Sequence, residues 1–210
     1  MFTWLPRLYP LTDVSLSELS HNEQVAQLIE GGATLIQLRE KGLSARDFYQ
    51  QAESALKVAR SRGAKIIIND RVDLALMLGA DGVHLGQDDL PPEFARQLLG
   101  SAAIIGFSTH SLDQAKRATD LPIDYLAIGP VFSTKTKSNT APEVGLEGVR
   151  QVKKIAGSIP VVAIGGITEE RTGEVLAAGA DSVAVISAVL CDPAGVKAST
   201  TRLLASVKQI

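Results

Sequence analysis

The sequence predicts an α/β protein with the (β/α)8 fold, the TIM barrel, formed by a single domain. Short aliphatic runs alternate with amphipathic segments along the whole chain, and this alternation occurs eight times. Repeated strand–helix alternation implies a parallel sheet with right-handed crossovers. Eight units favour a closed barrel, although an open doubly wound sheet would also accommodate eight strands. The length of 210 residues, of which 45% are hydrophobic, suits one compact domain over residues 1–210.

The strand-like segments are mostly apolar on both faces, as parallel strands are when helices cover each side of them. Several of these segments end abruptly in polar residues. In chain order, the predicted strands are residues 8–11, 35–38, 65–68, 82–85, 104–107, 125–128, 161–164 and 182–186.

The amphipathic segments between the strands predict helices. Two of them begin with the spacing of a capping box, Ser20 with Glu23 and Ser44 with Asp47, and both stop at glycine. The phrase Gly-Ala-Asp recurs at residues 79–81 and 179–181, where a helix gives way to the next strand. In chain order, the predicted helices are residues 20–30, 44–62, 72–78, 91–99, 112–118, 146–156, 169–178 and 193–207.

Composition excludes several classes of partner. The net charge is −2 and the basic residues are scattered, so we expect neither nucleic-acid nor membrane-surface binding. No apolar stretch approaches the roughly 18 residues of a membrane span, and residues 1–7 lack the order of a signal peptide. The single cysteine, Cys191, fits a reducing, cytoplasmic compartment, and we expect it to be a small buried residue. Apolar residues on the outer helix faces could either pack on the barrel or meet a second copy in a homodimer.

The second predicted strand leads into a cationic segment. Barrel active sites lie at the carboxyl ends of the strands. Strand alternation gives Gln37, Arg39 and Lys41 a common orientation toward the barrel mouth. Two cations with an amide suit a polyphosphate, because Arg binds as a planar fork and Lys as a mobile charge. The alternative is an ordinary charged surface run.

Oxygen-bearing side chains follow the third and fourth strands. Asn69 and Asp70 end one strand, and Gln87, Asp88 and Asp89 follow the other. Carboxylate and amide oxygens suit Mg²⁺, which usually shares itself with substrate phosphates. We therefore expect a Mg²⁺ site at Asp70 and one of the loop aspartates, with Asn69 bonding the substrate. The alternative is that Asp70 and one loop aspartate cap the helices that follow them.

Three further strand ends carry candidate binding residues. Ser108 is a plausible donor to a bound ring or phosphate, or else part of the start of the next helix. The long polar loop after the sixth strand carries Thr134, Thr136 and Lys137, which could close over an anion or form a merely flexible loop. After the last two strands, Gly166 and the backbone near Ser187 predict a phosphate cradle.

Taken in order, these segments resemble thiamine phosphate synthase over residues 8–190. The resemblance implies an alkyl-transferring enzyme that joins 4-amino-2-methyl-5-(diphosphooxymethyl)pyrimidine to thiazole phosphate, or its carboxylated form. Pyrophosphate would leave with Mg²⁺ as cofactor, through a dissociative pyrimidine-methylene cation. The segments that carry the resemblance are Gln37-Leu38-Arg39-Glu40-Lys41, Ile68-Asn69-Asp70, His84-Leu85-Gly86-Gln87, Gly129-Pro130-Val131-Phe132, Thr134-Lys135-Thr136-Lys137 and Gly165-Gly166-Ile167.

The resemblance also implies roles for single residues. Asp70 and Asp89 would hold Mg²⁺, and Arg39, Lys41 and Lys137 would act in catalysis. The pyrimidine diphosphate would be contacted by Gln37, Leu38, Arg39, Glu40, Lys41, Asn69, Ser108 and Lys137. The thiazole phosphate would be contacted by Thr134, Lys135, Thr136, Gly166, Ile186 and Ser187.

Two other functions compete with this one. A thiazole tautomerase of the same family would share the barrel, but it has little use for a diphosphate site. A barrel that binds a phosphorylated metabolite without catalysis would need the phosphate cradle alone. The combination of Arg39 and Lys41 with Asp70, Asp89 and Lys137 favours the coupling enzyme.

Overall fold

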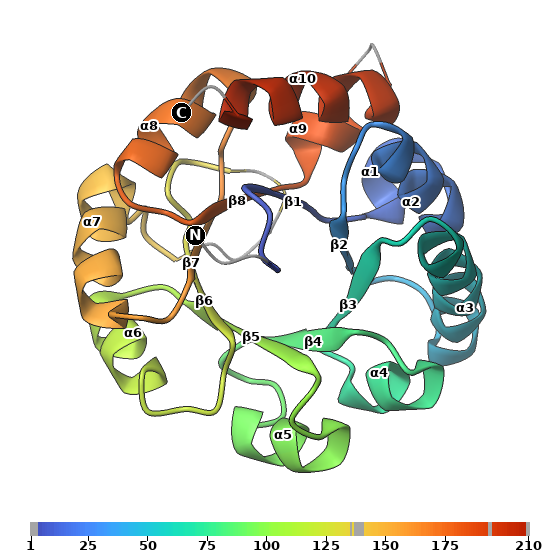
Figure 1. The fold of residues 1–210 in the computed structure, drawn as a ribbon, viewed down its shortest axis with the longest axis horizontal. Coiled ribbons are helices and arrows are strands. Elements are labelled where there is room, and N and C mark those ends of the chain that lie inside the picture. Colours follow the sequence, from blue (N-terminus) through green and yellow to red (C-terminus); the bar gives the residue numbers. More distant parts are fainter. Residues whose placement is uncertain (1–3, 135, 137–140, 193–194, 209–210) are drawn as a thin grey trace.

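Eight parallel strands form one sheet that curls around a central axis, and helices surround it as an outer ring (Figure 1). This computed structural model describes residues 4–134, 136, 141–192 and 195–208. The strand order is β1-β8-β7-β6-β5-β4-β3-β2, and Leu11 next to β1 bridges to Gln37 of β2. The Thr12 N–H donates to the Gln37 carbonyl at 2.9 Å, so the two edge strands meet. The prediction of a (β/α)8 barrel is confirmed.

The strands agree closely with the predicted segments. Strands β3 and β5 run one and two residues further than predicted, because Asn69, Ser108 and Thr109 continue the ladders toward the barrel mouth. Strands β1 and β8 each end one residue earlier than predicted. The strands are β1 (Leu8–Pro10), β2 (Leu35–Leu38), β3 (Lys65–Asn69), β4 (Gly82–Leu85), β5 (Ile104–Thr109), β6 (Tyr125–Ile128), β7 (Val161–Ile164) and β8 (Ser182–Val185).

The helices also match, apart from short elements that the sequence pattern did not reveal. Helices α1 (Val14–Ser17) and α9 (Ser187–Leu190) have four residues each, too few to show an amphipathic period. The predicted helix at 169–178 begins as a 3-10 turn, Glu169–Arg171, before α8. The others are α2 (His21–Glu30), α3 (Ala45–Ser61), α4 (Val72–Leu78), α5 (Pro92–Leu99), α6 (Leu112–Ala118), α7 (Gly145–Ala156), α8 (Thr172–Ala177) and α10 (Val196–Lys208).

Both predicted capping boxes point to real helix starts. Ser20 and Glu23 form the reciprocal box at α2, and the Ser44 hydroxyl accepts from the Asp47 N–H at 3.1 Å at the start of α3. Each cap satisfies backbone donors that the first turn of a helix leaves without partners. The capping residues in the local sequence therefore determine where these two helices begin.

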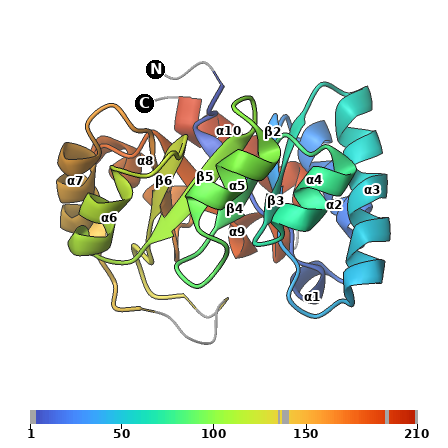
Figure 2. The same ribbon diagram turned by 90° about the horizontal axis from the view of Figure 1, so that it is seen from below.

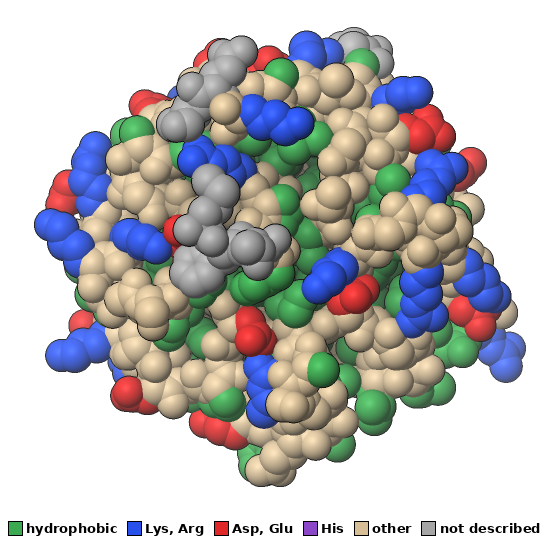
Figure 3. Space-filling model, viewed as in Figure 1, with side chains coloured by type: hydrophobic (Ala, Val, Ile, Leu, Met, Phe, Trp, Pro, Cys, Tyr) green, Lys and Arg blue, Asp and Glu red, His purple; other side chains and the backbone are tan. Residues whose placement is uncertain are grey.

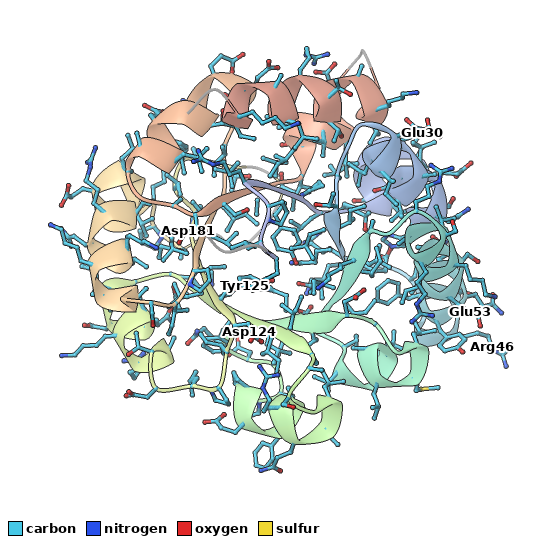
Figure 4. The ribbon with its side chains drawn as sticks, in the orientation of Figure 1. Glu30, Arg46, Glu53, Asp124, Tyr125 and Asp181 are labelled. Atoms are coloured by element: carbon cyan, nitrogen blue, oxygen red, sulfur yellow. The ribbon has the colours of Figure 1, made fainter. Side chains whose placement is uncertain are left out.

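Three aspartates tie neighbouring strands together at the end of the barrel where the strands begin. Their Oδ2 atoms accept backbone N–H groups: Asp81 from Ile66 at 2.9 Å, Asp124 from Ile105 at 2.7 Å and Asp181 from Val161 at 2.8 Å. Figure 4 labels Asp124 and Asp181 among the side chains around the barrel. The repeated Gly-Ala-Asp sequence therefore has a structural role, because its aspartate accepts a hydrogen bond from the neighbouring strand.

The surface departs from the sequence expectation at one residue. Cys191 is exposed rather than buried, because it follows the short helix α9 at the surface. Within the described ranges, no helix is long and apolar enough to cross a membrane.

Candidate active site

A cavity of about 670 Å³ opens at the carboxyl ends of the strands. In Figure 2, α1 and the described parts of the β6–α7 connection lie together at this end of the barrel. Twelve of the residues for which the resemblance implies a role line the cavity: Gln37, Arg39, Lys41, Asn69, Asp70, Asp89, Ser108, Thr134, Thr136, Gly166, Ile186 and Ser187. Gln87 and Asp88 of the β4–α5 loop line it as well. Lys135 and Lys137 lie outside the described residues.

Successive side chains of β2 and of the residues after it point alternately into the cavity and away from it. Gln37, Arg39 and Lys41 face the cavity, as predicted. Leu38 is fully buried in the hydrophobic core, and the Glu40 side chain turns toward α2. Neither Leu38 nor Glu40 is among the residues that line the cavity.

Glu40 instead organises the turn that follows β2. One carboxylate oxygen, Oε1, accepts the N–H groups of Lys41 at 2.8 Å, Gly42 at 2.6 Å and Leu43 at 3.0 Å. The other, Oε2, lies 3.1 Å from His21 Nε2. Burial by itself would raise the pKa of Glu40, but these donors outweigh it and lower the pKa below its ordinary value. The turn that carries Lys41 is therefore built around an ionised carboxylate.

Arg39 is held by a carboxylate that the sequence analysis missed. Asp13 caps the short helix α1 and forms an ion pair with the Arg39 guanidinium group. Arg39 is 8% exposed and Asp13 is 7% exposed, so the pair is buried beside the cavity. A buried guanidinium group needs such a partner, because an unpaired charge in the interior is costly.

Asp70, Asp89 and Lys41 form a charged cluster at the cavity rim. The Lys41 ammonium group is paired with Asp70 Oδ2, and Asp89 Oδ2 accepts the Gly86 N–H at 2.6 Å. Burial, and next the interaction with Asp70, raise the pKa of Asp89 above its ordinary value, against the lowering effect of the Gly86 N–H and Lys41. Two carboxylates close enough to oppose each other's ionisation provide a place for a cation.

The capping alternative for these aspartates is wrong. Helix α4 begins after Arg71 and α5 after Pro91, and neither start has a side-chain cap. Asp70 instead has a φ of 62°, a left-handed conformation that is uncommon outside glycine. The same holds for Ser108: α6 is capped by Ser111, whose hydroxyl accepts the Gln114 N–H at 3.2 Å.

The cavity floor is a set of aromatic and imidazole side chains, which the sequence analysis did not assign to the site. The Tyr9 and Tyr125 hydroxyl oxygens are 3.1 Å apart, and His84 Nδ1 is 2.8 Å from the Tyr125 hydroxyl. Burial raises the pKa of both tyrosines, so their hydroxyl groups stay protonated. The signal that could have revealed this floor is Gly106, because glycine inside a strand marks a close approach of neighbours.

The opposite side of the cavity is made of backbone. Gly166 has a φ of 64°, and a Cβ there would lie 2.4 Å from the Ser133 carbonyl oxygen, so only glycine fits beside the β6–α7 connection. Ile186 and Ser187 line the same part of the cavity, where α9 begins. The N–H groups in the first turn of a helix have no partner within the helix and can bind phosphate oxygens.

The donor set suits anions bridged by a hard cation better than it suits a transition metal. Within the part of the chain that the structure describes, no group of three or more His, Cys, Asp or Glu side chains could hold a metal. Two carboxylates are enough for Mg²⁺ when substrate oxygens and water complete its coordination.

The fold and this cavity define the class: a (β/α)8 barrel with a cavity at its strand ends, lined on one side by Lys41, Asp70 and Asp89 and on the other by the backbone at Gly166. Residues 8–189 match a family model described as thiamine monophosphate synthase. The chain belongs to this family.

Individual relatives support the assignment. The chain is 44% identical over 205 residues to a thiamine-phosphate synthase of Chloroflexus aurantiacus, covering 97% of this chain and 94% of the relative. It is 47% identical over 196 residues to one of Koribacter versatilis, covering 90% and 91%. Among solved structures, a thiamine phosphate pyrophosphorylase from Pyrococcus furiosus superimposes with a TM-score of 0.87 at 40% identity, covering 97% of this chain and 96% of that one.

Proposed function

We infer that this barrel, acting as one catalytic domain over residues 1–210, is a thiamine phosphate synthase. It couples 4-amino-2-methyl-5-(diphosphooxymethyl)pyrimidine with thiazole phosphate to give thiamine phosphate and pyrophosphate. With the carboxylated form of the thiazole phosphate, CO2 is released as a third product. The observation that carries this inference is the placement of Arg39, Lys41, Asp70 and Asp89 in the same cavity as the Gly166 and Ser187 cradle. A single phosphorylated ligand would leave half of these groups with nothing to bind.

The diphosphate lies against the cationic side of the cavity. Arg39 and Lys41 bind its oxygens, while Gln37, Asn69 and Ser108 contact the pyrimidine end. The bond between the methylene carbon and oxygen breaks with its electron pair leaving on pyrophosphate, so negative charge develops where the cations are placed. Donors and cations held in advance at such a position lower the barrier, because they need no reorganisation during the reaction.

The second substrate completes the reaction from the other side. Thr134, Thr136, Gly166, Ile186 and Ser187 hold the thiazole phosphate, and Lys135 and Lys137 keep their predicted roles. The thiazole nitrogen donates its lone pair to the pyrimidine-methylene cation, and no proton has to be removed. The site therefore needs aligned rings and charge stabilisation rather than a strong base or a nucleophilic side chain.

Mg²⁺ fits this site through Asp70 and Asp89. Asp70 and Asp89 both line the cavity and would supply two carboxylate ligands, with substrate oxygens and water completing the coordination. A bound Mg²⁺ would supply positive charge that stabilises the leaving pyrophosphate. The protein residues do the rest: they hold the two carboxylates, the cations and the rings in place.

The proposal is tested by incubating the purified protein with both substrates and Mg²⁺ and measuring thiamine phosphate and pyrophosphate. We expect both products, and a loss of about 100-fold or more in kcat/KM for Asp70→Asn. Asp73→Asn is the matched control, because Asp73 is paired with Arg71 on the exposed side of α4.

Each outcome has a distinct meaning. Absence of both products from the wild-type protein would overturn the function, and proton exchange on the thiazole without pyrophosphate release would indicate a tautomerase. Binding of thiazole phosphate without any turnover would indicate a binding module. Near-normal activity of Asp70→Asn would overturn the metal assignment alone.

The cellular setting belongs to the same proposal. We place the enzyme in the cytoplasm, where its substrates are small phosphorylated molecules and its exposed cysteine meets a reducing environment. Cell fractionation tests this placement, and recovery of the protein outside the cytoplasmic fraction would contradict it.

A homodimer is the remaining part of the proposal. Exposed apolar side chains gather on α4 and α5, where Figure 3 shows green patches at the lower edge: Leu76, Met77, Phe94 and Leu98. Burying them against a second copy would remove apolar surface from water. Light scattering should give twice the 22.2 kDa of one chain, and a monomer mass would refute the homodimer.

A further inference from the structure

We propose that Tyr9, Tyr125 and His84 are positioning residues that set the hydrogen-bond polarity of the pyrimidine site. They form a relay that turns the Gln37 amide oxygen and the Ser108 hydroxyl proton toward the ligand. The site thereby selects a 4-aminopyrimidine over its 4-oxo counterpart. This inference rests on the proposed function, because it takes the pyrimidine diphosphate as the ligand of this cavity.

The relay is a continuous chain of short hydrogen bonds along the cavity floor. Gln37 Nε2 donates to the Tyr9 hydroxyl at 3.0 Å, and the Tyr9 and Tyr125 hydroxyl oxygens are 3.1 Å apart. Tyr125 contacts His84 Nδ1 at 2.8 Å, and His84 Nε2 contacts the Ser108 hydroxyl at 2.8 Å. Gln37 and Ser108 stand at the two ends, and all five residues line the cavity.

Strand register brings these side chains together. His84 of β4 is in register with Gly106 of β5, and Gly106 with Tyr125 of β6. Because Gly106 has no side chain, the His84 and Tyr125 rings stack across β5, with centroids 5.5 Å apart and planes 20° apart. A Cβ on Gly106 would lie 2.0 Å from Tyr125 Cζ and 2.5 Å from His84 Nδ1. The contact between the two rings therefore requires glycine at this position.

The direction of the hydrogen bonds follows from Gln37, because its amide N–H group can only donate. The Tyr9 oxygen accepts from the Gln37 amide, so its single proton is available for Tyr125, and the Tyr125 proton for His84 Nδ1. A neutral imidazole that accepts at Nδ1 carries its proton at Nε2 and donates to Ser108. The Ser108 hydroxyl proton is then left for the ligand. In this order every proton along the chain has an acceptor, with His84 as the neutral tautomer that carries its proton at Nε2.

The Gln37 end supplies the complementary group. Gln37 is 2% exposed, and among the described residues no hydrogen-bond partner reaches its Oε1 atom. A buried amide oxygen without a partner is costly, so the site is built for a donor that arrives with the ligand.

Gln37 and Ser108, the two ends of the relay, together match the hydrogen-bonding groups on one edge of the pyrimidine ring. A 4-aminopyrimidine presents an exocyclic N–H donor beside a ring nitrogen acceptor, which suit Gln37 Oε1 and the Ser108 hydroxyl proton respectively. A 4-oxopyrimidine presents a carbonyl acceptor beside a ring N–H donor, so both contacts would be reversed. Leaving such buried polar groups mismatched is how a binding site rejects an analogue of the same shape.

The test measures binding rather than turnover, because an oxo group would also change the chemical step. The probes are 4-amino-5-hydroxymethyl-2-methylpyrimidine and its 4-oxo counterpart, neither of which carries a leaving group, titrated by calorimetry into the full-length protein. We expect the wild type to bind the amino compound more tightly by at least about 100-fold. In Tyr125→Phe this preference should fall at least about tenfold, because the ring stays while the relay is cut.

Control variants distinguish the loss of the relay from a general loss of structure. Tyr49→Phe makes the same chemical change on helix α3, outside the cavity, and should leave the preference unchanged. Tyr9→Phe cuts the relay at another link and should act as Tyr125→Phe does, which keeps the test valid if one variant unfolds. In the coupling reaction, the variants should raise KM for the pyrimidine diphosphate and leave KM for the thiazole phosphate unchanged.

An unchanged preference in both folded tyrosine variants, or a wild type that prefers the oxo compound, would overturn the relay. Failure of the wild type to make thiamine phosphate would overturn the proposed function instead. The binding preference can be measured in either case, so the two failures are distinguishable.

Discussion

Among the described residues of the site, Lys41 and Arg39 are two cations with different surroundings. The Lys41 side chain is 57% exposed and paired with Asp70, whereas Arg39 is buried and paired with Asp13. A mobile ammonium group at the rim can move between Asp70 and an incoming diphosphate, while a buried guanidinium group stays in one place. In the proposed reaction, Arg39 would therefore position the diphosphate, and Lys41 would capture it and neutralise the leaving group.

Replacing Lys41 with methionine keeps the length of the side chain and removes the charge. We expect kcat/KM for the pyrimidine diphosphate to fall by about 10- to 100-fold, because a charge-assisted hydrogen bond of about 1.5–3 kcal/mol is lost. Steady-state kinetics measure this effect. Lys57→Met is the control, since Lys57 pairs with Glu53 on α3, outside the cavity. Equal losses in both variants would show that the effect is not specific to the site.

At the scale of elements, strand β5 determines the shape of the cavity floor through Gly106. Its neighbours in register, His84 and Tyr125, occupy the space that a side chain would need. Alternation along a strand could place Ser108 at the cavity from the sequence, but the meeting of His84 with Tyr125 depends on the register of three strands. The register cannot be read from the spacing of residues in the sequence, so the sequence did not predict that His84 and Tyr125 form the cavity floor.

Gly106→Ala should disrupt the packing of this floor. The added Cβ would approach Tyr125 Cζ to 2.0 Å, and overpacking of this kind costs about 1–3 kcal/mol or more. Urea unfolding should show the loss, with a smaller loss for Gly42→Ala, whose Cβ would have only an ordinary contact of 3.6 Å with Glu40. Similar stability of the Gly106→Ala variant and the wild type would mean that the floor can relax around a side chain.

The turn after β2 predicts a pH dependence of stability. The pKa of Glu40 is lowered in the folded protein, against a usual value of 4.5, because the donors around it outweigh its burial. Its carboxylate therefore stabilises the fold above about pH 4.5, and this contribution is lost as the pH falls through the lowered pKa.

Glu40→Gln removes this contribution and keeps the shape of the side chain. The difference in unfolding free energy between wild type and Glu40→Gln should be largest near neutral pH and shrink as the pH falls below about 4.5. Urea unfolding over this pH range measures it, with Glu53→Gln on the outer face of α3 for comparison. A difference that does not change with pH would show that the carboxylate's charge has no part in holding the turn.

At the scale of the whole molecule, the site exists only when the barrel is closed. Gln37 lies in β2 and Asp70 directly follows β3, whereas Ser187 follows β8 near the other end of the chain. The bridge between Leu11 and Gln37 joins the two edge strands beside the cavity. A ligand that contacts both sides therefore stabilises the fold as a whole.

Magnesium with pyrophosphate should raise the melting temperature of the protein. A ligand at about 100 times its Kd adds about 2.7 kcal/mol, which corresponds to about 5–10 °C for a chain of this size. Thermal unfolding followed by circular dichroism measures the shift. Pyrophosphate with EDTA should give a smaller shift, and Asp70→Asn should abolish the difference. The same shift with and without Mg²⁺ in the wild type would contradict the metal assignment.

The sequence by itself determined the barrel and most of the cavity wall. Period-2 and helical patterns, capping boxes and glycine stops are local signals, and parallel strands necessarily bring their carboxyl ends together. For this reason Arg39, Asp70 and Gly166 could be placed at one end of the molecule before any coordinates were known. The family resemblance added Asp89 in preference to Asp88.

Only the tertiary structure decided which side chains meet. The pairing of Arg39 with Asp13, the turning of Glu40 toward His21 and the contact of His84 with Tyr125 join residues from different elements. Such contacts depend on strand register and on the angle at which each helix packs, and the one-dimensional pattern of the chain records neither. The sequence thus predicts where the chemistry lies, and the packing of the closed barrel decides how each group is oriented.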